Sequence, residues 1–264
     1  MGQSEDFELV ALVDRVPERC ELLIKEKGLK DVTAYEDLTR CLVDMSFDAL
    51  AIFTPDGTHG ALVIPALQAN KYVFVEKPLC RSLEELRAIR QAWLACPGRH
   101  LMSNLVLRAA PLYRWLHTAI RAGEFGEVYA FDGEYLYGRV RKITRGWRNT
   151  VPDYSVMQGG GVHLVDLMIG LTGRRPIGVT AVGNRVCTAG TAFKYDDYRA
   201  ATFSFESGLI GRITANFGCV HRHHHVVRVF GTKAMVEGIR IAQFPLAKLI
   251  ILLAPPMHRP SCHI

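Results

Sequence analysis

Three short apolar runs, each followed by polar or turn residues, constrain the fold of this chain more than any other feature. They are Leu9–Val13, Ala49–Phe53 and Tyr72–Val75, and none shows the polar alternation of a strand with one face in water. Such runs are typical of parallel strands that are covered on both faces. Segments with helical character separate the runs, which predicts a right-handed parallel α/β sheet over roughly the first hundred residues.

Local signals place the helices of this first region. Pro17 can open a helix at its first turn, and Gly28 ends that helix. A helix of small residues is expected over 60–69. The spacing of Ser82 and Glu85 forms a capping box that opens a helix running to about Leu94. The chain is then expected to return to the sheet over 101–107.

The sequence pattern changes near Arg108. A helix is predicted from Pro111 to Arg121, and a turn follows over Gly123–Gly126. Runs with alternating polarity, separated by short turns, then predict an open antiparallel sheet with strands at 180–186, 199–205, 209–217 and 226–230. Two domains are therefore predicted, residues 1–108 and 109–264.

Composition bounds the class of protein. The 264 residues are 49% hydrophobic, enough for a sizeable core. The net charge of +6 is dispersed without a basic block, so an acidic small molecule fits as well as a polyanion. No platform of basic and aromatic residues indicates nucleic-acid binding. The seven cysteines form no CxxC pair, which predicts thiols in a reducing compartment and no zinc site.

Two further observations concern location. The first residues, Met1–Asp6, are polar and acidic, whereas a signal peptide requires a basic and then an apolar run. The longest apolar region, 244–256, contains Pro245 and Lys248 and is too short to span a bilayer. A cytoplasmic protein that does not enter a membrane is predicted.

A functional site is expected where the third apolar run ends in Glu76-Lys77-Pro78. Functional groups in open α/β sheets gather at the carboxyl ends of the strands. A Glu-Lys pair after an apolar strand must reach water or line a cleft, because unpaired buried charge is very costly. These residues alone permit two interpretations, a solvated strand end that Pro78 closes and a functional site.

The cluster His221–His225 permits two interpretations. Alternate residues of a strand share a face, so His221, His223 and His225 could converge on a metal ion. No acidic or cysteine ligand lies nearby in the sequence, which favours a strand leading into Val226. No metal site is predicted.

Four motifs together resemble the Gfo/Idh/MocA oxidoreductases. They are Thr54-Pro55, Glu76-Lys77-Pro78, Gly123–Gly126 and Gly159–Asp166, and the resemblance covers about Phe7 to Glu237. It implies an NAD(P)-dependent dehydrogenase of sugars or cyclitols. The implied fold class is α/β: a partial Rossmann-like parallel sheet that binds the cofactor, then an α+β domain with an open antiparallel sheet for substrate and oligomerisation.

The resemblance also assigns roles to residues. Lys77 matches the catalytic lysine, and His163 matches a histidine that is a candidate acid/base of the second domain. The implied contacts to the nicotinamide end of the cofactor, besides Lys77, are Thr54, Pro55, His59, Glu76 and Pro78. The Lys77-Pro78 peptide bond is expected to be cis. A lysine beside a reacting hydroxyl can hold or move its proton while a hydride leaves the same carbon.

Asp14 ends the first apolar run, where such folds place the acid that binds the adenosine ribose. An acid there favours NAD, although Arg15 beside it keeps NADP possible. The alternative for Asp14 is a capping residue in the turn before Pro17.

The substrate is expected to be a sugar or nucleotide sugar. Its predicted contacts are Asn104, Arg108, Trp147, Arg148 and Asp166, since an aromatic face with guanidinium groups suits a sugar ring or its phosphate.

The sequence departs from the family pattern at two places. The fingerprint G-x-G-x-x-G is expected about twenty residues before Asp14, where Gly2 is the only glycine. The strand that carries it lies between the runs Leu9–Val13 and Ala49–Phe53 in the usual order, so those runs are expected to lack their shared neighbour. Gly159 stands where many relatives have an aspartate that orients the histidine. An amino-terminally truncated enzyme is expected; the alternative is a non-catalytic homologue that dimerises or binds a ligand.

The open sheet over 180–230 has a face left to cover, because no helices follow it. A homodimer or homotetramer is predicted.

Overall fold

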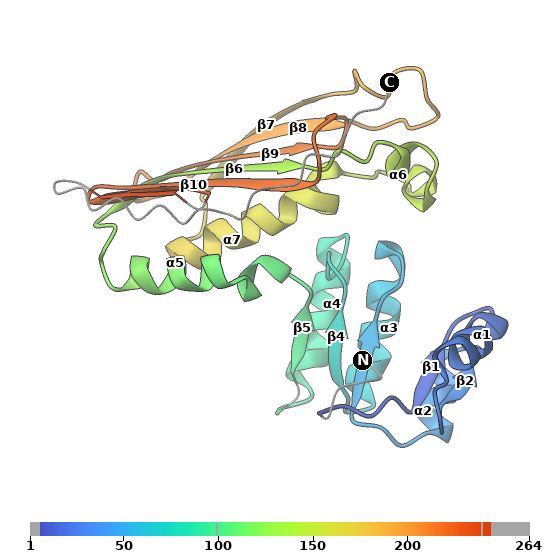
Figure 1. Ribbon diagram of the computed structural model, residues 1–264. Coiled ribbons are helices and arrows are strands. Elements are labelled where there is room, and N and C mark those ends of the chain that lie inside the picture. The colour runs from blue at the N-terminus through green and yellow to red at the C-terminus, as the bar shows by residue number, and fades with distance from the viewer. Residues whose placement is uncertain (1–5, 99, 239, 244–264) are drawn as a thin grey trace. The chain divides into compact units, whose positions relative to one another are not determined.

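The computed structural model describes residues 6–98, 100–238 and 240–243 (Figure 1). They form two compact units, residues 1–104 and residues 105–264. Each unit has its own sheets and its own buried core.

The core of the first unit is a parallel sheet of three strands in the order β3-β4-β5. Its strands are β3 (Ala49–Ile52), β4 (Tyr72–Val75) and β5 (Leu101–Ser103). Helices α3 (His59–Gln68) and α4 (Leu83–Leu94) pack on one face, and the buried residues of the cluster include Ile52, Val63, Leu67, Val73 and Ile89. Phe53, which directly follows β3, and Met102 of β5 remain about 60% exposed.

The remaining strands of this unit form a separate parallel pair. Strand β1 (Ala11–Val13) pairs with β2 (Thr33–Tyr35), flanked by α1 (Pro17–Lys27) and α2 (Leu38–Asp44). Within the described residues, β1 and β3 belong to different sheets, which confirms that these two apolar strands lack a shared neighbour. No residue of β1 is buried, and β2 was not predicted.

The local signals for helix ends are confirmed. Pro17 is the first residue of α1, and Gly28 ends it in the left-handed conformation. The hydroxyl of Ser82 accepts a hydrogen bond from the backbone N–H of Glu85, which is the N-cap half of the predicted capping box; the Glu85 carboxylate binds the backbone N–H of Arg81 in place of that of Ser82.

One strand prediction was too long. The predicted strand 101–107 stops at Ser103, because the backbone N–H of Asn104 makes the last hydrogen bond to Val75 O and the chain turns into η2 (Val106–Ala109).

The second unit is built on a seven-stranded sheet in the order β12-β11-β10-β6-β9-β8-β7. The strands are β6 (Val128–Leu136), β7 (Gly178–Asn184), β8 (Tyr198–Ser204), β9 (Ile210–Asn216), β10 (His224–Gly231), β11 (Ala234–Glu237) and β12 (Arg240–Gln243). The expectation of a purely antiparallel sheet needs one correction: β6 and β9 are parallel. A long connection joins them, as parallel neighbours require.

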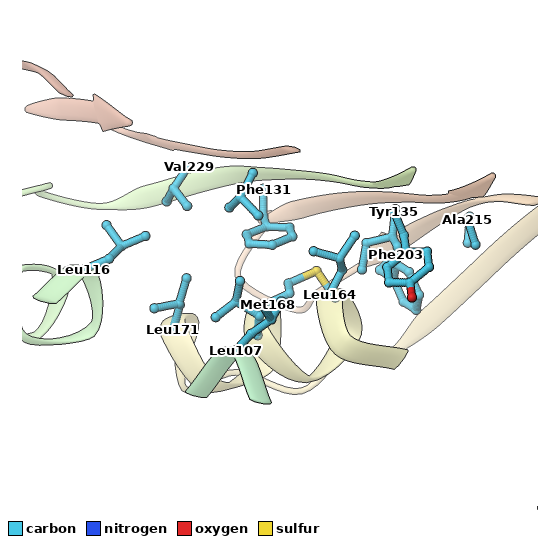
Figure 2. Packing of buried hydrophobic residues seen from close by; sticks show 14 of the residues in the cluster. Leu107, Leu116, Phe131, Tyr135, Leu164, Met168, Leu171, Phe203, Ala215 and Val229 are labelled. Carbon is cyan, nitrogen blue, oxygen red and sulfur yellow. The ribbon is translucent and has the colours of Figure 1, made fainter. Parts of the chain in front are cut away.

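Helices α5 (Pro111–Arg121) and α7 (Val162–Thr172) lie on one face of this sheet (Figure 1). Figure 2 shows Leu164 and Met168 of α7 beside Phe131 of β6, while Leu116 of α5 lies below Val229 of β10; all five are buried. The opposite face carries ion pairs between strands, Arg212 with Asp132, and Arg228 with both Glu134 and Glu237.

Short helices connect these elements: η1 (Asp56–Thr58), α6 (Arg141–Thr144), η3 (Trp147–Thr150) and η4 (Met157–Gly161). In the part of the chain that the structure describes, no helix combines the length and apolar character needed to cross a membrane. The six cysteines in that part are free thiols.

Candidate functional site

The loop after β4 carries Glu76, Lys77 and Pro78 and is held on several sides within the first unit. The sheet ladder ends just before it, where the backbone N–H of Glu76 donates to Ile52 O at 2.9 Å. Lys77 is half-buried and Pro78 is buried. The bond between them is cis, which confirms the expectation.

Glu76 is fixed by a neighbouring strand end. Its Oε1 accepts a hydrogen bond of 2.6 Å from Nδ2 of Asn104, and its Oε2 accepts one of 3.2 Å from the backbone N–H of Lys77. Asn104, which the sequence predicted as a substrate contact, thus lies at the same sheet edge as Glu76 and Lys77.

His59 is fully buried, and both of its ring nitrogens face backbone oxygens. Nδ1 lies 2.6 Å from Pro78 O, and Nε2 lies 3.0 Å from Thr54 O. The ring therefore connects the loop after β3 to the loop after β4. Thr54 and Pro55 themselves are exposed at this edge, where the hydroxyl of Thr58 lies within hydrogen-bond distance of both Thr54 Oγ1 and Pro55 O.

Glu85 of α4 holds the far end of the same loop. Its carboxylate accepts hydrogen bonds from the backbone N–H of Arg81 at 2.8 Å and of Gly60 at 3.1 Å. A Cβ atom on Gly60 would lie 2.3 Å from Glu85 Oε1, so the absence of a side chain there permits the contact. The sequence suggested Glu85 only as the acidic half of a capping box, and its carboxylate has this role instead.

Asp14 and Arg15 follow β1, on the separate two-stranded sheet. Asp14 Oδ1 accepts a hydrogen bond of 2.9 Å from the backbone N–H of Val16, and Nη1 of Arg19 lies 3.7 Å from it. Asp14 thus has the turn-capping role that its place before Pro17 suggested. Its other oxygen, Oδ2, accepts no hydrogen bond from the described residues.

The second unit places His163 at the start of α7, after a π-helical turn that contains Gly159, Gly160 and Gly161. A Cβ atom on Gly160 would lie 2.4 Å from the ring of Tyr135, and one on Gly159 would lie 2.2 Å from the hydroxyl of Tyr154. The glycines therefore let the helix start approach the aromatic side chains of the sheet. A π-helical turn of this kind is frequent at functional sites.

His163 is buried in a cluster of aromatic rings. Its ring stacks on Tyr135 with centroids 6.2 Å apart, and His225 meets it edge-on at 6.1 Å. His223 lies 5.1 Å from both Tyr135 and His225. We call these four residues the imidazole cluster.

The environment of the imidazole cluster disfavours charge. Burial, and then the neighbouring His223, His163 and His224, lower the pKa of His225 to about 4. Burial also raises the pKa of the Tyr135 hydroxyl well above its ordinary value. At neutral pH, His225 is therefore an uncharged group beside His163.

Of His221, His223 and His225, which could have converged as alternate residues of a strand, only two do. His223 and His225 share a face with His163, whereas His221 contacts His224 and its Nδ1 lies 2.8 Å from Arg222 O. Across the described residues, no group of three or more His, Cys, Asp or Glu side chains is arranged to hold a metal ion.

Trp147 and Arg148 lie close to the imidazole cluster. The Arg148 guanidinium stacks on the Trp147 ring at 4.5 Å. The charges of Arg148 and Arg139 oppose the rise in the pKa of Tyr135, so both lie near enough to its hydroxyl to act on it. Arg139 also lies over Tyr137, at 5.6 Å.

Arg108 and Asp166 bind each other instead of remaining open to a ligand. Two guanidinium nitrogens of Arg108 donate to the two carboxylate oxygens of Asp166, and this pairing raises the pKa of Arg108. Both line a cavity of about 720 Å³ that is bordered by α5 and α7. A substrate that contacted either residue would have to share it with the ion pair.

Sequence analysis found the residues that follow a strand or a glycine run, and missed those that reach the site from elsewhere. Tyr135 and His225 belong to strands β6 and β10, which are neighbours in the sheet although almost ninety residues separate them in the chain. Neither residue lies in one of the four predicted strands, and no local signal paired them with His163.

Comparison with known proteins gives a consistent result. Residues 1–94 match the family model described as "Oxidoreductase family, NAD-binding Rossmann fold", and residues 113–237 match the model of the GFO/IDH/MocA C-terminal domain. The chain is 28% identical to scyllo-inositol 2-dehydrogenase (NAD(+)) of Bacillus subtilis over 86% of its length. It is 33% identical to 1,5-anhydro-D-fructose reductase of Ensifer adhaerens over 60% of its length.

These alignments span 65% and 45% of the two relatives, so the chain covers less than two thirds of each. Among solved structures, scyllo-inositol dehydrogenase from Lactobacillus casei with bound NAD(H) and scyllo-inositol has a similar fold. The two structures superpose with a TM-score of 0.81 at 20% sequence identity, and the match covers 90% of this chain and 70% of the Lactobacillus casei chain.

Proposed function

This chain belongs to the Gfo/Idh/MocA oxidoreductase family, and on that premise we propose that it is an NAD-dependent dehydrogenase. Its proposed substrate is a secondary alcohol of a sugar, cyclitol or nucleotide sugar. The observation that carries the proposal is the loop after β4, where Glu76 and Pro78 are each held by a buried or half-buried partner and Lys77 stands between them. This restraint fixes where the Lys77 side chain leaves the sheet edge, as a catalytic group requires.

The donor set at the sheet edge fits part of the cofactor. The proposed contacts to the nicotinamide and its ribose are Thr54, Pro55, Glu76, Lys77 and Pro78. The open Oδ2 of Asp14 suits a ribose hydroxyl, and its charge would repel the phosphate of NADP, although Arg15 could offset that repulsion. The described residues contribute no glycine-rich turn for the pyrophosphate.

Lys77 has the proposed role of holding and moving the proton of the substrate hydroxyl. NAD, when bound, supplies the hydride acceptor. His163 is proposed as the second acid/base, kept among uncharged rings by the imidazole cluster. Asn104, Arg108, Trp147, Arg148 and Asp166 are the proposed substrate contacts. We further propose a cytoplasmic homodimer or homotetramer.

The separation of β1 from β3 favours a second candidate, a ligand-binding or dimerising protein without catalysis. Backbone groups at these strand edges lack the neighbour that a Rossmann-like sheet provides. Cofactor binding distinguishes the two functions.

NADH titration of the chain, followed by thermal shift and tryptophan fluorescence, tests the proposal. A ligand at a hundredfold excess over its dissociation constant stabilises the native state by about 2.7 kcal/mol. We expect a clear rise in melting temperature with NADH and a smaller one with NADPH. A folded sample with no shift for either would contradict the dehydrogenase and favour the second candidate.

Replacing Lys77 tests the catalytic role directly. Once sugars and cyclitols have been screened for turnover, Lys77→Met should lower kcat by about 10²- to 10⁴-fold, the usual contribution of a positioned acid/base. Lys27→Met removes an exposed lysine of the same unit and should leave kcat unchanged. Near-full turnover in Lys77→Met would show that another group transfers the proton.

A further inference from the structure

We propose that His59 is a positioning residue for Lys77 and makes no contact with the cofactor. The inference rests on the proposed function, because the position of Lys77 matters to the reaction only if Lys77 takes part in it. It departs from the sequence-based expectation that His59 contacts the nicotinamide end.

The hydrogen bonds of the ring carry the argument. Nδ1 lies 2.6 Å from Pro78 O and Nε2 lies 3.0 Å from Thr54 O. A carbonyl oxygen only accepts, so the ring nitrogen that carries the proton donates to the carbonyl it faces, and the tautomer decides which of the two bonds this is. Both nitrogens are committed to backbone groups, and none of the side chain is exposed. The ring has neither a spare polar atom nor the surface to contact a ligand.

The bridge continues the sheet beyond its last ladder bond. Strands β3 and β4 are joined up to the bond from Glu76 N–H to Ile52 O, and their two loops then leave the sheet. His59 connects those loops through Thr54 O and Pro78 O. Its side chain joins the two segments as the backbone ladder does two residues earlier on each of them.

The position of Lys77 follows from its two neighbours. On one side Glu76 is bound to Asn104 at 2.6 Å, and on the other Pro78 is bound to His59. Two adjacent fixed residues determine where the Lys77 backbone lies and in which direction its side chain leaves. Loss of the His59 bond frees one of these two sides.

A lysine-specific measurement tests this role without the cofactor. Reductive methylation with ¹³C-formaldehyde gives each lysine an NMR signal, and the signal of Lys77 is identified by its loss in Lys77→Arg. His59→Phe keeps a ring of similar size and removes both ring nitrogens, and with them the N–H donor. We expect the Lys77 signal to move or to split into several, while the signals of exposed lysines stay in place.

Val63→Ala is the matched control, because Val63 is also fully buried in α3 but contacts the core instead of the loop. It should lower the melting temperature and leave the Lys77 signal where it is. His59→Gln retains N–H donors and should restore much of the wild-type signal; it also serves if His59→Phe does not fold. An unchanged Lys77 signal in a folded donor-free variant, or an equal change in Val63→Ala, would overturn the inference.

The kinetic pattern separates positioning from cofactor contact. With a turned-over substrate, His59→Phe should lower kcat tenfold or more and change the dissociation constant of NADH less than threefold. A cofactor contact would show the reverse, a large loss of NADH affinity. The Lys77 signal is recorded without NADH, so it tests the role of His59 whether or not the chain binds the cofactor. A failure of the proposed function would instead appear in the NADH titration.

Discussion

Histidine has different roles in the two units, and the contacts of the rings distinguish these roles. His59 binds two backbone carbonyls, while His163, His223 and His225 pack against one another and Tyr135. A cluster of imidazoles is stable only while most of its members are uncharged, because like charges at these separations repel. The pKa of His225 is low mainly because the ring is buried, and the neighbouring histidines lower it further.

The stability of the second unit should therefore fall in mild acid. The pKa of His225 is about 4 in the folded state against an ordinary value of 6.5. Between these values the unfolded chain binds more protons, so stability decreases as the pH falls from about 6.5 to about 4. Partial exposure of the ring reduces the effect, and we expect a contribution of about 1 kcal/mol between pH 7 and pH 5.

Urea denaturation at the two pH values measures this contribution. His225→Gln should lose less stability between pH 7 and pH 5 than the wild-type chain does, while His117→Gln, at an exposed position on α5, should behave like wild type. Equal losses in the wild type and in His225→Gln would show that another group controls the acid sensitivity.

At the scale of elements, the start of α7 shows how glycine can be required by packing. Glycine inside a helix normally costs about 1 kcal/mol relative to alanine. At Gly160 the helix start lies so close to Tyr135 and Phe217 that a Cβ atom would be 2.4 and 2.9 Å from their rings. The close approach places His163 within the imidazole cluster.

Two glycine substitutions should therefore change the free energy of unfolding in opposite directions. Gly160→Ala should destabilise the chain by about 1–3 kcal/mol, because it overpacks a rigid aromatic core. Gly170→Ala should stabilise it by about 0.5–1 kcal/mol, since that position in the same helix has open space around it. Urea denaturation of both variants measures the difference. A neutral Gly160→Ala would mean that the rings of Tyr135 and Phe217 move aside.

At the scale of the whole molecule, the open face of the seven-stranded sheet is the main surface left to cover. Val182 of β7 and Ile210 of β9 are 69% and 51% exposed, and ion pairs such as Arg212 with Asp132 lie on the same face. Helices α5 and α7 cover only the other face (Figure 1). A second copy of this sheet would cover apolar and charged groups together.

We expect light scattering at micromolar concentration to give the mass of a dimer or tetramer. Val182→Glu combined with Ile210→Glu should shift the mass to that of the monomer, because it places unpaired carboxylates in the interface. Glu substitutions at exposed Leu22 and Val43 in the first unit form the control and should leave the mass unchanged. A monomeric wild-type chain would rule out this assembly.

The sequence by itself determined the parts of this protein that depend on neighbours in the chain. Apolar runs defined β1, β3 and β4, Pro17, Gly28 and Ser82 set helix ends, and a strand ending in an acid, a base and a proline located the candidate site. These signals are local, because backbone conformation and the face of a strand depend on a few consecutive residues.

The tertiary structure decided what depends on distant residues. It paired β6 with β9 in parallel, turned the ring of His59 onto Pro78 and Thr54, and brought His225 to His163. It also bound Arg108 to Asp166, although each had been read as a contact for substrate. Such pairings arise from hydrogen bonding and packing between segments far apart in the chain, and no short stretch of sequence records them.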